Sequence, residues 1–308
     1  MIKKKVLITP EGFSKIKIDK KLFSKKIQYT HNGKIFNSKK VLKETLKNYD
    51  GCIIGSEKID KQVIDCCPKL KGIVRFGIGL DNIDLPYAKK KGIIVKNIKA
   101  KSISDAVSIH TISLILAVTQ NLKLHFANAK KGIWLRHLNL LPKDVSVGVV
   151  GAGNIGLKVI NYLVTLGFKV NYFSRKKKIK LKKLNVKFFS DIDKLIKKSD
   201  IITLHIPSIN NKQPLLDQNK LSKIKNKCLI NLSRGSVVDE KAILKNLNNK
   251  KIKFYATDVF SYEPPSKISK KLLIHPNVIS TAHVGGYNKT TLKEVSENAI
   301  CKINDILN

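Results

Sequence analysis

The stretch Ser146-Val147-Gly148-Val149-Val150-Gly151-Ala152-Gly153-Asn154-Ile155-Gly156 decides the fold of this chain. Its first five residues are mostly β-branched and apolar, which predicts a buried strand, and a helix-like run follows at residues 157–166. The two are joined by the pattern Gly-x-Gly-x-x-Gly. Here Gly151 allows a tight turn, Gly153 lets a ligand approach the backbone, and Gly156 lets the helix pack closely on the strand.

This glycine turn predicts a site for a pyrophosphate. The N–H groups of Asn154 and Ile155 begin the helix, have no partner within it, and would face an anion. The pattern alone is weak, and a structural turn that binds nothing is the alternative. A strand before the turn, a helix after it and a second strand after Gly167 favour a dinucleotide-binding unit.

The same alternation extends outward from the turn along the chain. Short apolar runs alternate with amphipathic, lysine-rich stretches, which predicts an α/β fold with parallel sheets. Six parallel strands after a glycine turn is the count of a full Rossmann sheet. The strands expected in this part are 146–150, 169–173, 186–188, 201–205, 228–232, 254–258 and 278–280. In the first hundred residues we expect strands at 6–9, 52–54, 73–76 and 93–95, and helices at 38–48 and 59–66.

Two further helical segments indicate how the domains are joined. The apolar segment 102–122 would carry the chain from the first domain into the second. The amphipathic segment 290–307 could return it to the first. We therefore expect a discontinuous substrate domain of residues 1–100 and 287–308 and a dinucleotide-binding Rossmann domain of residues 101–286.

Composition narrows the class of protein. Hydrophobic residues make up 43% of the 308 residues, which excludes wholesale disorder and favours two domains. The longest apolar run, 111–118, is far short of the ~20 residues of a membrane span, and the basic start lacks the apolar core of a signal peptide. The five cysteines form no CxxC pair. We expect a cytoplasmic protein with no membrane contact and no metal site.

The net charge of +38 suggests nucleic-acid binding, but its make-up argues against it. Of the 60 basic residues only four are Arg, and the Lys residues are spread over the whole chain. Nucleic-acid surfaces cluster their charge and use Arg for bidentate contacts. We attribute the charge to a compositional bias and expect no nucleic-acid partner. The four Arg residues become candidates for tasks that need a guanidinium.

Five blocks of sequence resemble those of the D-isomer-specific 2-hydroxyacid dehydrogenases, a family that includes phosphoglycerate, glyoxylate/hydroxypyruvate and D-lactate dehydrogenases. The resemblance runs from about Val6 to Leu292. The blocks, in the family's order, are Arg75-Phe76-Gly77-Ile78-Gly79-Leu80-Asp81-Asn82-Ile83-Asp84, the glycine turn, Asn231-Leu232-Ser233-Arg234-Gly235, Asp258-Val259-Phe260-Ser261-Tyr262-Glu263-Pro264, and Pro276-Asn277-Val278-Ile279-Ser280-Thr281-Ala282-His283.

The resemblance implies a fold and an activity. The fold is a Rossmann domain plus a smaller discontinuous flavodoxin-like α/β domain, with a cleft between them. The activity is that of an NAD(P)-dependent oxidoreductase acting on a CH–OH group, a D-2-hydroxyacid dehydrogenase or 2-oxoacid reductase. Three alternatives stay open: a specific D-3-phosphoglycerate dehydrogenase, a non-enzymatic NAD(H)-sensing corepressor, and a nucleic-acid-binding protein.

The family's catalytic Arg, Glu and His fall on Arg234, Glu263 and His283. The chemistry agrees, because a guanidinium can fork onto the carboxylate and ketone of a 2-oxo acid. Hydride transfer to the ketone leaves an alkoxide, so a proton donor must be within reach. His283 would be that donor, and Glu263 would hold its other ring nitrogen.

Further cofactor contacts are implied by the resemblance. Asp258 would accept a hydrogen bond from the nicotinamide carboxamide. Leu232 and Ser233 would line the nicotinamide ring, and His205 and Pro207 would border the adenosine.

The loop after the second Rossmann strand bears on the choice of cofactor. NAD-specific sites place an acidic residue there, but the family's acidic position falls on Ser174, and Arg175 follows it. No Asp or Glu occurs between Leu157 and Ser190. Ser174 and Arg175 could bind a 2′-phosphate. We therefore favour NADP(H), with NAD(H) as the alternative.

Substrate and partner expectations complete the prediction. By resemblance, the backbone N–H groups of Gly77, Ile78 and Gly79 would bind the substrate carboxylate. Arg75 would either reach a substrate phosphate or hold the interdomain cleft. The family commonly has an acidic residue before His-Thr, where this chain has Ile109. The apolar helix at 102–122 would form the contact of a homodimer.

Overall fold

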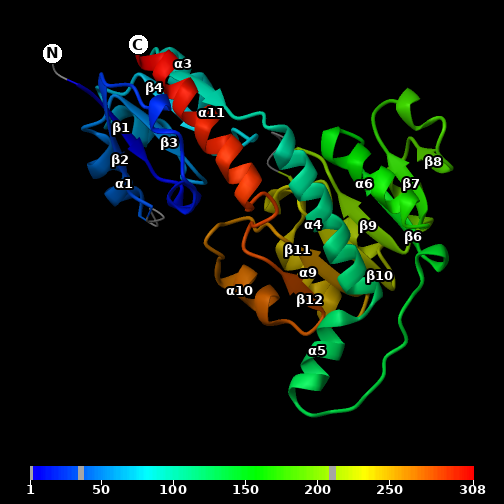
Figure 1. The fold of residues 1–308 in the computed structure, drawn as a ribbon. Helices are drawn as coiled ribbons and strands as arrows, with labels where there is room; N and C mark the ends of the chain where they lie inside the picture. Colours follow the sequence, from blue (N-terminus) through cyan, green and yellow to red (C-terminus); the bar gives the residue numbers. More distant parts are fainter. Residues whose placement is uncertain (1–2, 34–37, 208–212) are drawn as a thin grey trace. The chain divides into compact units, whose positions relative to one another are not determined.

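The structure is a computed structural model that describes residues 3–33, 38–207 and 213–308, in two compact units (Figure 1). Unit 1 comprises Met1–Ile103 and Gly286–Asn308, and unit 2 comprises Ser104–Gly285. The sequence-based boundaries, after residue 100 and before residue 287, lie close to these.

Unit 1 is built on a parallel five-stranded sheet in the order β2-β1-β3-β4-β5. This is the flavodoxin-like order, which confirms the expected fold of the smaller domain. Its strands are Lys4–Ile8 (β1), Ile27–His31 (β2), Gly51–Ile54 (β3), Gly72–Arg75 (β4) and Ile94–Asn97 (β5). Its helices are Lys39–Leu46 (α1), Lys61–Asp65 (α2), Leu85–Lys90 (α3) and Lys289–Leu307 (α11), with short 3₁₀ turns at Glu11–Lys15 (η1) and Lys20–Leu22 (η2).

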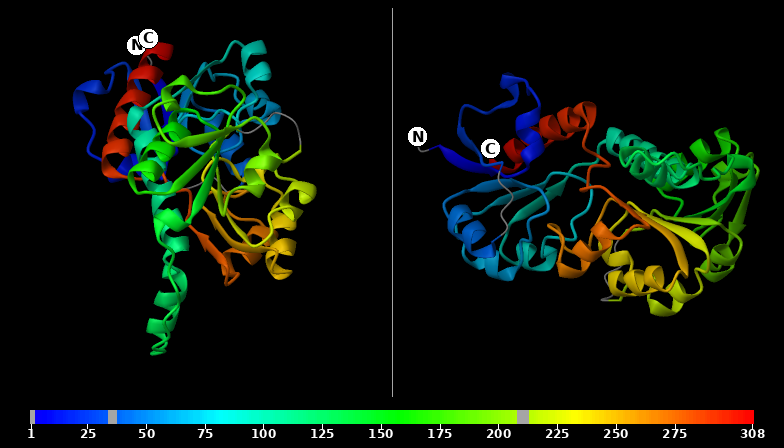
Figure 2. Two further views of the ribbon diagram at one scale, coloured as in Figure 1. Left: turned by 90° about the vertical axis from the view of Figure 1, so that its right-hand side faces the viewer. Right: turned by 90° about the horizontal axis from the view of Figure 1, so that it is seen from below.

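Helix α11 returns the C-terminus to unit 1 and covers one face of its sheet (Figures 1 and 2). The contact depends on two strand glycines. A methyl group at Gly51 would lie 2.9 Å from Ile303 Cδ1, and one at Gly72 would lie 2.5 Å from Ile306 Cγ2. The apolar side chains of α1, α2 and α3 pack with the strands in a second cluster.

Unit 2 contains a parallel seven-stranded sheet in the order β12-β11-β10-β9-β6-β7-β8. In chain order this is the Rossmann arrangement with a seventh strand added, so the expected fold class is confirmed. The order reverses between β6 and β9, and ligands of such sheets bind beyond the carboxyl ends of the strands at that point. The strands are Ser146–Val150 (β6), Lys169–Phe173 (β7), Val186–Phe189 (β8), Ile201–Leu204 (β9), Lys227–Asn231 (β10), Ile252–Thr257 (β11) and Val278–Ser280 (β12).

Helices cover both faces of this sheet. Helices α4 and α6 contribute to one apolar cluster, and α7, α8, α9 and α10 contribute to the other. The helices are Lys101–Thr119 (α4), Leu122–Lys130 (α5), Asn154–Thr165 (α6), Ile192–Lys197 (α7), Gln218–Ser222 (α8), Glu240–Asn248 (α9) and Lys267–Ile274 (α10). Short 3₁₀ turns lie at Pro142–Asp144 (η3), Ile179–Leu181 (η4) and Gly235–Val237 (η5).

Several boundaries differ from the sequence-based expectation. Strand β2 was not expected. The apolar segment 102–122 is two helices, because Asn121 adopts a left-handed backbone (φ 47°) between α4 and α5. The segment 59–66 is helical only over Lys61–Asp65, because the side chain of Asp60 caps that helix by accepting from the Val63 N–H.

Among the described residues, one helix, α4, is long and apolar enough to cross a membrane by length and composition. Its residues Ile112, Leu114 and Ile115 are buried in the core of unit 2. A core helix of a water-soluble protein has this same character, so the helix is weak support for a membrane span.

Candidate active site

The glycine turn lies at the switch point of the unit 2 sheet, between β6 and α6. Gly151 has a positive φ of 101°, and a methyl group there would lie 2.4 Å from the carbonyl oxygen of His205. A methyl at Gly156 would lie 1.9 Å from the carbonyl oxygen of Gly151. Both positions therefore require glycine. Gly153 differs, because a methyl there would meet no atom of the described residues within 4 Å.

That open space is where a ligand can approach the turn. Gly153 is the N-cap of α6, and Asn154 and Ile155 are its first two residues, so their N–H groups have no acceptor within the helix. A helix N-terminus carries a partial positive charge. The turn therefore has the N–H groups and the open space that a pyrophosphate site needs.

The loop after β7 carries Ser174 and Arg175. The Phe173 carbonyl accepts from the Gly151 N–H at 2.9 Å, so this loop begins next to the glycine turn. Ser174 is only 8% exposed, and its hydroxyl donates to the Lys176 carbonyl at 2.6 Å. Arg175 is exposed. The loop therefore offers a cation and a hydroxyl oxygen but no carboxylate.

His205 and Pro207 follow β9 on the other side of β6. The His205 N–H donates to the Val150 carbonyl at 2.7 Å, and its Nε2 lies 3.0 Å from Thr203 Oγ1. Burial lowers the pKa of His205 to about 3. The ring is therefore neutral at physiological pH and cannot act there as a cationic ligand for phosphate.

Arg234 lies just beyond β10. The Asn231 side chain holds the segment 231–234: its Nδ2 donates to the Arg234 carbonyl at 2.9 Å, and its Oδ1 accepts from both the N–H and the hydroxyl of Ser233. Leu232 is buried. The Arg234 guanidinium also donates to the Ser233 carbonyl at 2.8 Å. Two predicted cofactor residues and the predicted catalytic Arg thus share one fixed turn.

Glu263 and His283 are in side-chain contact. His283 Nδ1 lies 2.7 Å from Glu263 Oε2, and Glu263 Oε1 accepts from the Phe260 N–H at 3.1 Å. His283 adopts a left-handed backbone (φ 53°), and its side chain is partly exposed. With Nδ1 engaged by a carboxylate, Nε2 is the ring nitrogen that can exchange a proton with a ligand.

Asp258 fixes the turn that carries His283. It follows β11, is 3% exposed, and accepts from the N–H groups of Val284 and Gly285, each at 2.8 Å, and from the Thr281 hydroxyl. Its carbonyl accepts from the His283 N–H at 2.9 Å. Burial alone raises the pKa of Asp258, but hydrogen bonds from His110, Thr281, Val284 and Gly285 outweigh it, so the pKa lies below its ordinary value.

His110 of α4 extends this network, and sequence reasoning assigned it no role. Its Nε2 lies 3.0 Å from Thr281 Oγ1 and 3.7 Å from Asp258 Oδ1. The Thr281 hydroxyl has one proton and donates it to Asp258. It can therefore only accept from His110, which requires a proton on Nε2.

Of the predicted substrate-binding residues, Arg234 lies in unit 2, and the other four lie in unit 1 at the carboxyl end of β4. The Arg75 guanidinium folds back over its own loop: Nη1 donates to the Phe76 carbonyl at 2.9 Å, and a methyl at Gly77 (φ 143°) would lie 1.6 Å from this same nitrogen. Ile78 is exposed, its carbonyl accepts from Asn97 Nδ2, and Gly79 follows. Arg75 thus braces the loop in this conformation.

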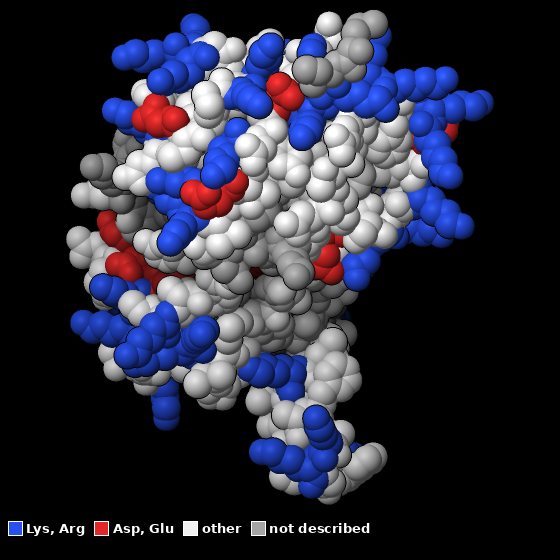
Figure 3. All heavy atoms as spheres, turned by 90° about the vertical axis from the view of Figure 1, so that its left-hand side faces the viewer, with Lys and Arg blue, Asp and Glu red and all other residues white. Residues whose placement is uncertain are grey.

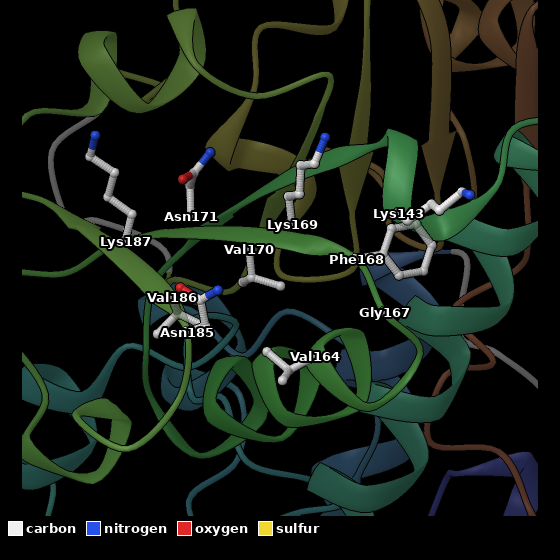
Figure 4. Close-up of a pocket in the computed structure, with 10 residues that line it drawn as sticks. All are labelled: Lys143, Val164, Gly167, Phe168, Lys169, Val170, Asn171, Asn185, Val186 and Lys187. Atoms are coloured by element: carbon white, nitrogen blue, oxygen red, sulfur yellow. The ribbon is translucent and has the colours of Figure 1, made fainter.

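A hollow of about 730 Å³ lies at the opposite end of the unit 2 strands (Figure 4). Figure 4 shows Lys169 and Asn171 pointing to one side of β7 and Val170 to the other, as alternation along a strand requires. The lining therefore comes from both faces at the rim of the sheet. The hollow contains none of the predicted site residues, and we assign it no ligand.

Basic side chains are dispersed over the face of the molecule that Figure 3 shows. Lys and Arg residues are scattered across it with Asp and Glu between them, and they do not gather in one stripe. A nucleic-acid-binding surface concentrates its positive charge. On this face the basic residues are not concentrated in that way.

Comparison with known proteins adds independent information. The family model described as "D-isomer specific 2-hydroxyacid dehydrogenase, NAD binding domain" matches residues 112–285. The chain is 35% identical over 263 residues to D-3-phosphoglycerate dehydrogenase of Methanocaldococcus jannaschii, covering 83% of this chain but only 49% of that protein. It is 33% identical over 252 residues to hydroxypyruvate reductase of Thermotoga maritima, covering 80% of each.

A solved structure supports the same relationship. The crystal structure of D-lactate dehydrogenase from Aquifex aeolicus, complexed with NAD and lactic acid, has a TM-score of 0.83 and 26% identity to this chain. The match covers 98% of this chain and 95% of that one.

Proposed function

Because the chain belongs to the family of D-isomer specific 2-hydroxyacid dehydrogenases, we propose that it reduces a small 2-oxo acid, or oxidises the matching D-2-hydroxy acid. The observation that carries the proposal is the Glu263–His283 pair, whose 2.7 Å contact leaves Nε2 for proton exchange in the same unit as a glycine turn that fits a pyrophosphate. An oxidoreductase of this kind needs both features.

The cofactor would be held by unit 2. The N–H groups of Asn154 and Ile155 would bind the pyrophosphate beside Gly153, and His205 and Pro207 would border the adenosine. Leu232 and Ser233 would line the nicotinamide. Asp258 Oδ2 accepts a hydrogen bond from the Gly285 N–H and, as a carboxylate oxygen, retains capacity for the carboxamide. When bound, the nicotinamide supplies or takes the hydride.

The chain's own residues would handle charge and protons. Arg234 would bind the carboxylate and ketone oxygens of the 2-oxo acid as a fork. In reduction His283 Nε2–H would give its proton to the oxygen that becomes the hydroxyl, and in oxidation the same nitrogen would take it. Glu263 would stabilise the imidazolium and hold the ring in position, since its Oε2 contacts Nδ1.

NADP(H) is the proposed cofactor, and the loop after β7 supports it. A carboxylate would repel a 2′-phosphate, and no Asp or Glu occurs between Leu157 and Ser190. Because the Ser174 hydroxyl already donates to Lys176, Arg175 would provide most of the phosphate contact. We expect kcat/KM for NADPH to exceed that for NADH by at least ~10-fold, about 1.4 kcal/mol.

The cofactor proposal is tested by changing the charge of the loop after β7. Ser174→Asp combined with Arg175→Ala should reverse the preference, whereas the matched control Lys177→Ala should change it little. A wild-type enzyme that prefers NADH would refute the NADP(H) proposal and leave the proton-transfer assignment intact.

The substrate is proposed only as a class, since the relatives carry several names. Glyoxylate, hydroxypyruvate, pyruvate and phosphohydroxypyruvate should be compared as substrates. Arg75→Ala separates the two roles of that residue. If Arg75 binds a phosphate, the variant loses activity selectively on phosphohydroxypyruvate. If it braces the 76–79 loop, as its contact with the Phe76 carbonyl suggests, activity on all four acids falls alike.

We also propose a cytoplasmic homodimer. Residues 122–141, here called the apolar arm, project away from the unit 2 sheet (Figure 2). Trp134 is 89% exposed and Leu138 92%, and large apolar side chains exposed on one short segment are typical of an interface. The arm continues from α4, the helix that the sequence predicts as the dimer contact. All five cysteines are free thiols, which fits a reducing compartment.

Sedimentation velocity tests the dimer. The wild type should sediment as a dimer at micromolar concentration, and Trp134→Asp with Leu138→Asp should shift it to monomer. Ile274→Asp, at an exposed apolar residue outside the arm, is the control and should stay dimeric. A monomeric wild type would refute the proposal.

A further inference from the structure

Glu240 is a buried carboxylate that the proposed mechanism does not use. It is the first residue of α9 and is only 8% exposed. A carboxylate removed from water is costly unless its oxygens accept hydrogen bonds. Capping of α9 does not explain it, because the side chain of Asp239 already accepts from the N–H groups of Lys241 and Ala242.

Both oxygens of Glu240 are aimed at another segment. Oε1 accepts from the Ser261 N–H and Oε2 from the Ser269 hydroxyl, each at 2.6 Å. Ser261 lies on the stretch that connects β11 to α10, and Ser269 lies in the first turn of α10. The two serines therefore bound residues 261–269, here called the Glu263 segment. The positive end of the α9 dipole adds to the stabilisation of the carboxylate at this place.

We propose that Glu240 is a positioning residue that holds the Glu263 segment at both ends and so keeps Glu263 against His283. Glu240 anchors Ser261, which lies two residues before Glu263. The residue before Ser261 is Phe260, whose N–H donates to Glu263 Oε1. Loss of the anchor removes the acceptor of the Ser261 N–H and frees the segment to move. The Glu263–His283 contact of 2.7 Å then loosens.

The role is one of geometry rather than of charge. A Gln at this position can accept from the Ser261 N–H with its oxygen and donate to the Ser269 hydroxyl with its amide, since that hydroxyl lies 2.9 Å from Ser266 Oγ and can donate there instead. An Asp is shorter by one methylene group and cannot keep both contacts. An Ala keeps neither.

Kinetics with four variants test the inference, which rests on the proposed function. Glu240→Ala should lower kcat by at least about 10-fold with KM values within about 3-fold, and Glu240→Gln should stay within about 3-fold of wild type. Asp239→Ala is the matched control: it removes a cap from the same helix, lowers Tm, and should leave kcat unchanged. If Glu240→Ala does not fold, Glu240→Asp takes its place.

A double-mutant cycle asks whether Glu240 acts through Glu263. In the Glu263→Gln background, Glu240→Ala should lower kcat by less than about 3-fold, because the contact between residue 263 and His283 that Glu240 supports is already impaired. An equal loss in both backgrounds, or an unchanged kcat in Glu240→Ala, would overturn the proposal.

Amide hydrogen exchange separates this inference from the proposed function. The Ser261 amide should exchange at least about 10-fold faster in Glu240→Ala than in wild type, and Glu240→Gln should stay close to wild type. This result is independent of turnover. An enzyme inactive on every 2-oxo acid would refute the proposed function alone, whereas unchanged exchange at Ser261 would refute the anchor alone.

Discussion

Gly235→Ala should both destabilise the protein and impair catalysis, because Gly235 is the point where the Arg234 turn packs on the Glu263 segment. A methyl group at Gly235 would lie 2.0 Å from the Phe260 carbonyl carbon, 2.2 Å from the Ser261 nitrogen and 2.3 Å from the Phe260 oxygen. Carbon contacts are optimal at about 3.5–4.0 Å, so the two backbones must separate by more than about 1 Å. Backbone atoms cannot rotate away as a side chain can.

The magnitude follows from that separation. Overpacking typically costs about 1–3 kcal/mol, and contact with backbone on the partner side places this variant at the upper end. For a unit of this size, about 2–3 kcal/mol lowers Tm by roughly 4–12 °C. A displacement of about 1 Å between catalytic groups can also cost about 100-fold in rate, so we expect a comparable loss of kcat/KM at temperatures where the variant is folded.

The assay is thermal denaturation followed by circular dichroism, paired with steady-state kinetics at 25 °C. Gly286→Ala is the matched control, because a methyl at Gly286 meets no atom within 4 Å and its Tm should stay near that of the wild type. A Gly235→Ala protein with the Tm and activity of the wild type would show that the two segments do not pack as described.

Two further outcomes follow from the site. The pKa of Asp258 is lower in the folded state than its unfolded value near 3.9. Its ionised form therefore stabilises the fold above about pH 4. This stabilisation is lost as the pH falls through the folded-state pKa. The difference in free energy of unfolding between wild type and Asp258→Asn, measured in urea, should therefore shrink from pH 6 to pH 3, and a constant difference would contradict the network. Gly153→Ala should leave Tm within about 1 °C of wild type, because the methyl meets no atom within 4 Å in the part of the chain that the structure describes. It should nevertheless raise the cofactor KM by at least about 10-fold, and an unchanged KM would place the pyrophosphate elsewhere.

The fold was largely predictable because its decisive signals are local. The glycine turn, with a strand before it and a helix after it, predicted the Rossmann unit, and buried apolar runs predicted the strands of its sheet. Strand β2 escaped prediction because it is an edge strand whose sequence, Ile27-Gln28-Tyr29-Thr30-His31, has little buried surface. The helix break at Asn121 was also missed. The segment is largely apolar on both sides of this residue, so its hydrophobic pattern does not indicate that a left-handed residue separates two helices.

The candidate site was predictable only where motifs exist. Glu263 and His283 were found by resemblance, and the structure brings them together. Glu240 and His110 were assigned no role, because their partners lie far along the chain: Ser261 is 21 residues from Glu240, and Thr281 is 171 residues from His110. A buried polar pair of this kind has no periodicity, and only the packing of α9 and α4 reveals it.

In the proposed reaction His283, held by Glu263, exchanges the proton while Arg234 binds the 2-oxo acid. The most direct measurement is kcat/KM for the preferred 2-oxo acid with NADPH in wild type, His283→Ala and Arg234→Ala, with circular dichroism to establish that each variant is folded. We predict a loss of at least about 100-fold in each variant. A folded His283→Ala protein that kept near-full activity would show that His283 does not exchange the proton.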